Sequence, residues 1–158
     1  MANYHAGIVV RRALFRLPAR VNNDLVPWVT FTDPELAHVG LSEDAARQRK
    51  LDIGVLRWSL HENDRAQAER ATDGLIKVVI TKPGKILGAT IVGEHAGELI
   101  QIWSLAVSQG MNIKAMAQYI SPYPTLGEIG KRAAGTYFLP KLTSPFVRKT
   151  VQFLSRFG

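Results

Sequence analysis

Apolar and polar positions along the chain predict β-strands first and helices after them. Four segments rich in β-branched, aromatic and other apolar residues predict strands at 28–32, 53–60, 75–80 and 86–92. The last two flank the turn sequence Pro83-Gly84, so we expect them to pair as an antiparallel hairpin.

Helical patterns dominate the later part of the chain. Residues 97–109 carry apolar side chains nearly all round and are followed by Gly110, a common helix-stop residue, so this helix is expected to be central. Shorter helices are predicted from Asn112 and near Thr125, and an earlier helix begins after the capping residue Ser42. Strands followed by helices favour an α+β fold, with an antiparallel sheet packed against helices.

The two ends differ from this central pattern. Residues 4–16 follow a loose helical register that Pro18 is expected to stop, and they resemble the tail of a preceding domain. At the other end Ser144-Pro145 is a typical helix start, beyond which apolar and basic side chains separate onto opposite sides. The chain is therefore predicted to end in a basic amphipathic helix.

Composition limits the chemistry that the chain can perform. Its 158 residues, 46% of them hydrophobic, suit one globular domain. It contains no cysteine, so any redox thiol must come from elsewhere. Its four histidines lack the spacing of metal ligands, so no metal site is predicted. Two of them, His38 and His95, are interpreted as hydrogen-bonded structural residues in preference to catalysts.

The formal net charge is +7, and both ends of the chain are basic. Basic residues distributed in this way can bind nucleic acid or a membrane surface. The sequence has no nucleic-acid-binding motif, so no nucleic acid partner is expected. A solvated surface, or an interface with protein outside this chain, is the favoured interpretation. The sequence shows neither an apolar run of about 18 residues nor a cleavable leader pattern, so we expect a soluble cytoplasmic protein.

The most informative motif is Tyr123-Pro124-Thr125-Leu126-Gly127-Glu128. It resembles the His-Pro-Thr-x-x-Glu turn that closes the C-terminal dimerisation domain of the FAD-dependent pyridine nucleotide-disulfide oxidoreductases, with Tyr123 in place of the histidine. Further segments resemble the same domain in the same order: Thr32-Asp33-Pro34-Glu35-Leu36-Ala37-His38-Val39-Gly40, Gly74-Leu75-Ile76-Lys77, Leu87-Gly88-Ala89 and Gly97-Glu98-Leu99-Ile100. Several motifs in the same order over residues 26–138 indicate this domain far more specifically than any single motif does.

Within that family the chain looks most like mercuric reductase and dihydrolipoamide dehydrogenase. Mercuric reductases end in a cysteine pair that this chain lacks, so the substrate is left unassigned. The resemblance implies a closing helix and linker of a preceding FAD domain at 1–25, the dimerisation domain at 26–140 and the basic amphipathic helix at 141–158.

The resemblance also implies cofactors and partners. FAD and NAD(P) are expected in a longer parent enzyme, with none bound by this chain alone. The expected partners are a second copy, forming a homodimer, and the missing FAD and NAD(P) domains. Without those domains the isolated chain is expected to have no catalytic activity, whereas the parent is expected to be a flavin-dependent oxidoreductase.

The resemblance makes Tyr123 and Glu128 candidate catalytic residues, and Tyr123 and Pro124 candidate contacts to the flavin. In the family the histidine accepts a proton from a thiol while the glutamate orients it. A phenol with a pKa of about 10 is a poor base at neutral pH, so Tyr123 is expected to donate a hydrogen bond or to pack against flavin or substrate. An equally weighted alternative is that Tyr123 is a turn aromatic and Glu128 a capping carboxylate.

Two other functions were weighed against the dimerisation module. The first is a free-standing interaction protein without catalytic activity. The second is a membrane-peripheral module acting through residues 144–157, whose apolar side would enter the lipid while the basic side meets anionic headgroups. Docking of this helix on protein is favoured over a membrane, because one helix with four positive charges gives only modest lipid affinity.

Overall fold

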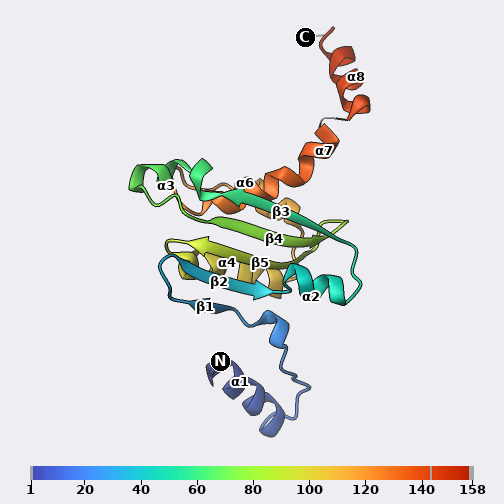
Figure 1. Cartoon of the computed structure of the whole chain (residues 1–158). Helices are drawn as coiled ribbons and strands as arrows, with labels where there is room; N and C mark the ends of the chain where they lie inside the picture. The colour runs from blue at the N-terminus through green and yellow to red at the C-terminus, as the bar shows by residue number, and fades with distance from the viewer. Residues whose placement is uncertain (1, 143, 157–158) are drawn as a thin grey trace.

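The computed structural model describes residues 2–142 and 144–156. Within them one antiparallel sheet of five strands has the order β1-β2-β5-β4-β3 (Figure 1). The strands are β1 (Trp28–Thr30), β2 (Glu35–Gly40), β3 (Ile53–Ser59), β4 (Leu75–Thr81) and β5 (Ile86–Gly93). The hairpin expected around Pro83-Gly84 is β4–β5, and the predicted α+β fold is confirmed.

Helices occupy most of the remaining chain. They are α1 (Ala2–Ala13), α2 (Glu43–Gln48), α3 (Asp64–Glu69), α4 (Ala96–Ser108), α5 (Ile113–Gln118), α6 (Glu128–Gly135), α7 (Leu139–Leu142) and α8 (Pro145–Leu154), with 3-10 turns at Asn23–Leu25, Leu60–Glu62 and Thr136–Phe138. The caps predicted at Ser42 and Ser144 are confirmed, because each side chain accepts a hydrogen bond from a first-turn amide. Asn112, where a short helix was predicted to begin, caps α5 in the same way.

The expectation that Pro18 stops the first helix is wrong. Helix α1 ends at Ala13, before the proline is reached. Arg16 adopts a left-handed conformation (φ 50°), and the Leu17 amide donates a hydrogen bond back to the Arg11 carbonyl oxygen (2.9 Å). This local capping arrangement turns the chain out of the helix.

Strand β2, which the sequence patterns did not predict, carries two structural polar side chains. Glu35 begins β2, and its Oε2 accepts a hydrogen bond from the Gly97 amide at the start of α4 (2.9 Å). His38 accepts a hydrogen bond from the Thr90 hydroxyl at Nδ1 (2.9 Å) and donates from Nε2 to the Gly40 carbonyl oxygen (3.0 Å). The interpretation of His38 as a structural residue is confirmed.

The main core lies between one face of the sheet and helices α4, α5 and α6. Helix α4 buries Ile100, Trp103 and Ala106 against the sheet, as expected for a central helix. However, its apolar side chains are not covered all round, because Ile102 is 41% exposed and Leu105 is 58% exposed. Only one side of α4 has a packing partner within the described residues.

The Trp103 side chain of α4 packs directly against Gly130 of α6. A Cβ atom at Gly130 would lie 3.0 Å from Cζ2 and 3.1 Å from Nε1 of Trp103. Trp103 is only 1% exposed and cannot move aside into solvent. An added methyl would therefore press on the Trp103 ring by a few tenths of an ångström in a closely packed core, so glycine suits this contact.

We expect Gly130→Ala to lower the free energy of unfolding by about 1–3 kcal/mol, because the added methyl overpacks the Trp103 ring. Gly135→Ala is a matched control in the same helix, where a Cβ atom would meet nothing within 4 Å. It should leave stability unchanged or raise it by up to about 1 kcal/mol. Urea unfolding followed by tryptophan fluorescence measures both, and equal midpoints for the two variants would contradict the packing argument.

Candidate functional site

The turn between α5 and α6, residues 119–127, carries the predicted site residues. The Asn63 side-chain amide donates a hydrogen bond to the Thr125 carbonyl oxygen (3.1 Å), and the Thr125 hydroxyl donates to the Pro122 carbonyl oxygen (2.9 Å). Asn63 is only 4% exposed, and its Oδ1 accepts a hydrogen bond from the Ala66 amide (2.9 Å), which caps α3. One buried side chain therefore joins α3 to the turn.

Tyr123 projects from this turn and is 69% exposed. Its hydroxyl donates a hydrogen bond to Oδ2 of Asp64 (3.0 Å), the first residue of α3. The Tyr123-Pro124 peptide bond is cis. The ring is thus accessible to another molecule, while its hydroxyl is held by the chain itself.

Asp64 also controls the protonation of Tyr123. It raises the pKa of the phenol above its ordinary value, first through the hydrogen bond and then through its negative charge, and Glu128 adds a smaller contribution. Tyr123 therefore stays protonated at neutral pH. Its single proton points to Asp64, so the phenol offers an incoming group its ring and its oxygen lone pairs.

Glu128 lies at the start of α6 and is half-buried. Its charge suits the positive end of the helix dipole. Within residues 2–142 and 144–156 no hydrogen bond to its carboxylate is formed, and the carboxylate that holds the Tyr123 hydroxyl is Asp64. Glu128 is therefore close enough to influence Tyr123 electrostatically without orienting it through a hydrogen bond.

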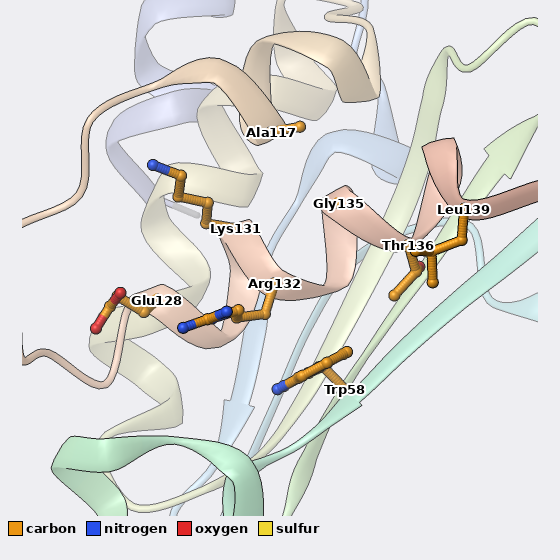
Figure 2. A pocket seen from close by; sticks show the side chains of 8 residues that line it. All are labelled: Trp58, Ala117, Glu128, Lys131, Arg132, Gly135, Thr136 and Leu139. Carbon is orange, nitrogen blue, oxygen red and sulfur yellow. The ribbon is translucent and has the colours of Figure 1, made fainter. Parts of the chain in front are cut away.

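A groove with a volume of about 500 Å³ runs along the outer side of α6, with Glu128 among its lining residues. Figure 2 shows Trp58 of β3 on the Arg132 side of the helix, and Ala117 of α5 on the side of Lys131. The indole Nε1 of Trp58 is buried without a hydrogen-bond partner among the described residues. The groove thus combines the Lys131 and Arg132 cations with the Glu128 carboxylate.

Pro124 borders a different hollow, of about 400 Å³, together with Arg65, Glu69 and His95. The structure therefore places Tyr123 beside Asp64 and puts Pro124 and Glu128 in separate hollows. A flavin bound next to this turn would meet the exposed ring of Tyr123 and the side chain of Pro124. These two residues can cover a cofactor but cannot enclose one. No cluster of three or more potential metal-ligating side chains occurs in the part of the chain that the structure describes.

Asn63 and Asp64 are the site residues that the sequence patterns missed. No helix was predicted at this point of the chain, although Asn followed by Asp is a typical helix start. That signal was enough to predict α3. It could not reveal the contact with Tyr123, which lies 59 residues further along the chain.

Comparison with known proteins adds a family to this geometry. Residues 26–134 match the family described as "Pyridine nucleotide-disulphide oxidoreductase, dimerisation domain". The mercuric reductase of Bacillus cereus is 36% identical over 138 residues, which cover 87% of this chain and 22% of that protein. The dihydrolipoyl dehydrogenase of Geobacillus stearothermophilus is 37% identical over 131 residues, covering 82% of this chain and 28% of that protein. The chain thus spans about a quarter of the length of these relatives.

Solved structures show the same fold. LpdA from Mycobacterium tuberculosis superimposes with a TM-score of 0.76 at 23% identity, over 84% of this chain and 29% of that one. The HOCl-induced flavoprotein disulfide reductase RclA from Escherichia coli superimposes with a TM-score of 0.71 at 26% identity, over 80% of this chain and 30% of that one.

The link between Asp64 and Tyr123 can be tested by titration. Asp64→Asn removes the charge but keeps an oxygen acceptor, so the pKa of Tyr123 should fall toward the value of about 10 found for a free phenol. Phenolate absorbance against pH, corrected by subtracting the Tyr123→Phe variant in each background, isolates this group. Asp44→Asn, at the start of α2, is the matched control and should leave the titration unchanged. An unaltered pKa in Asp64→Asn would contradict the assignment.

Proposed function

The chain belongs to the dimerisation-domain family of the pyridine nucleotide-disulphide oxidoreductases, and we propose that it is the dimerisation module of a longer FAD-dependent, NAD(P)-linked oxidoreductase. In this proposal two copies associate, and each completes the flavin and disulfide site of its partner subunit. Redox chemistry belongs to the parent enzyme, because this chain has no cysteine to form a redox disulfide. The electron acceptor is unassigned.

The observation that carries the proposal is the oriented but open phenol of Tyr123. Its hydroxyl is held by Asp64 at 3.0 Å, while most of its ring is exposed. Holding a large side chain in one orientation in solvent costs conformational entropy. Such an arrangement is useful where a molecule from outside the chain meets the ring, as expected for a residue that covers the site of another subunit.

Apolar surface next to the turn supports association with a second copy. Besides Ile102 and Leu105 on α4, Ile120 is 93% exposed. A cleft of about 260 Å³ lies between α4 and the turn, and Leu99, Ile102, Tyr119 and Pro122 are among its lining residues. If two copies associate symmetrically through this surface, the apolar side chains are covered and Tyr123 lies at the edge of the partner subunit.

In the proposed role FAD, bound by the parent enzyme, supplies the electron transfer. The part played by this chain is positional. The Tyr123 ring would cover the reacting groups and exclude water, and its oxygen would accept a hydrogen bond from a thiol. Because its pKa is raised, ionised Tyr123 is not available as a base at neutral pH.

The comparisons favour this proposal over the two alternatives. The matched relatives are named as reductases and dehydrogenases, and the matched family is a dimerisation domain. A free-standing interaction protein, or a membrane-peripheral module without catalytic activity, accounts for the fold but gives no reason for the arrangement around Tyr123.

The proposed interface predicts a monomer–dimer equilibrium in sedimentation equilibrium runs across protein concentration. Ile102→Glu should weaken the dimer roughly 100-fold, because a charge would be buried without a partner. Leu51→Glu, which follows α2, is a matched control, since Leu51 is 39% exposed and Ile102 41%. It should leave the equilibrium unchanged. A monomer at every concentration, or equal weakening by both variants, would count against this interface.

The proposed role of Tyr123 is testable in the longer parent enzyme. Tyr123→Phe keeps the ring and removes the oxygen, so stopped-flow absorbance should show unchanged flavin reduction by NAD(P)H and about tenfold slower reoxidation by a disulfide. Tyr137→Phe removes a hydroxyl that donates to the Lys82 carbonyl oxygen, at the β4–β5 hairpin, and serves as the control. If the Tyr123→Phe enzyme is reoxidised at the wild-type rate, the proposed hydrogen bond from a thiol to the Tyr123 oxygen is ruled out.

A further inference from the structure

Helix α8 separates its apolar and basic side chains. Its ten residues begin after the Ser144 cap, with Pro145 in the first turn. Successive helical side chains are rotated by about 100°. Phe146, Val147, Val151 and Leu154 therefore lie on one side, and Arg148, Lys149 and, just past the helix, Arg156 lie toward the other.

Within the part of the chain that the structure describes, Phe146, Val151 and Leu154 on this apolar side stay largely exposed. Phe146 is 78% exposed, Val151 59% and Leu154 60%, and none of the residues of α8 is buried. Figure 1 shows α8 beyond α7, extending away from the sheet and the helices that cover it. A concentration of exposed apolar side chains on one helix is a mark of a binding surface.

The positive charge of α8 and of Arg156 is not neutralised by ion pairs among the described residues. Every charged side chain after Glu128 is basic: Lys131, Arg132, Lys141, Arg148, Lys149 and Arg156. Arg47 in α2 and Arg65 in α3 each pair with a glutamate one helical turn away. In the part of the chain that the structure describes, Arg148, Lys149 and Arg156 form no ion pair.

We propose that α8 is an interfacial helix that binds the surface of an anionic lipid bilayer. Phe146, Val151 and Leu154 would enter the boundary between headgroups and acyl chains, while the basic side chains meet the anionic headgroups. No helix among the described residues has the length and apolar character needed to cross a bilayer. The contact proposed for α8 lies in the plane of the interface.

The sequence by itself favoured docking of this helix on protein, but charge complementarity together with the exposed apolar side selects an anionic bilayer over a protein or a nucleic acid. A nucleic acid would neutralise the basic side chains but leave the apolar side in water. A groove on another protein could cover the apolar side, but it would need acidic residues at matching positions to neutralise the cations. An anionic bilayer accommodates both sides along the whole helix without such matching.

This inference is independent of the proposed redox role. Helix α8 follows the residues that match the oxidoreductase family, which end at 134. In a dimer whose two α8 helices face the same side, their combined binding would exceed that of one helix.

Co-sedimentation of the 158-residue chain with lipid vesicles tests the proposal. We expect binding to vesicles of equal parts phosphatidylglycerol and phosphatidylcholine, at least tenfold tighter than to phosphatidylcholine alone, and weaker binding as salt is added. The triple variant Arg148→Gln, Lys149→Gln, Arg156→Gln should bind about 100-fold more weakly, because each basic residue contributes roughly a factor of five. Phe146→Ser should bind about tenfold more weakly through lost apolar burial.

A control of equal net charge comes from the other basic end of the chain. Arg11, Arg12 and Arg16 are exposed, and replacing all three with Gln should leave vesicle binding nearly unchanged. Circular dichroism should confirm that every variant is folded. Equal loss in the two triple variants, full binding by Phe146→Ser, or no preference for anionic vesicles would each overturn the proposal.

Discussion

The buried amide of Asn63 is the contact on which the candidate site depends. At 4% exposure its side chain has little access to water, and losing either of its two hydrogen bonds would leave a buried polar group unpaired, at a cost of about 1–3 kcal/mol. One bond begins α3 and the other holds the turn before α6. Together they bring Asp64 within 3.0 Å of the Tyr123 hydroxyl and set the point from which α6 continues.

Apolar surface is divided between one internal core and several open helix faces. The inner side of α4 packs on the sheet, and its Trp103 side chain packs directly against Gly130 of α6. The outer side of α4 and the apolar side of α8 have no such cover among the described residues. This division suits a family whose members work as parts of larger assemblies, because the same small domain must fold and also present contact surfaces.

The motif that residues 123–128 resemble has a histidine where this chain has Tyr123, and the two side chains offer different chemistry. An imidazole gains and loses a proton near neutral pH, whereas a phenol does not, and Asp64 moves the pKa of Tyr123 still further from neutrality. The proposed contribution of Tyr123 therefore consists of covering and hydrogen bonding, with proton transfer left to other groups of the parent enzyme. The oriented pair in this chain is Tyr123 with Asp64, and Glu128 acts at longer range.

The sequence by itself determined the features that depend on neighbouring residues. The β4–β5 hairpin, the caps at Ser42, Asn112 and Ser144, and the amphipathic pattern of α8 follow from turn chemistry and short periodicities, and the ordered motifs indicated the family. Strand β2 was missed because its strand structure depends on pairing with β1 and β5. Only the tertiary structure decided that Asp64 holds Tyr123 and that one side of α4 stays open. Both result from contacts between residues distant along the chain, which no local pattern records.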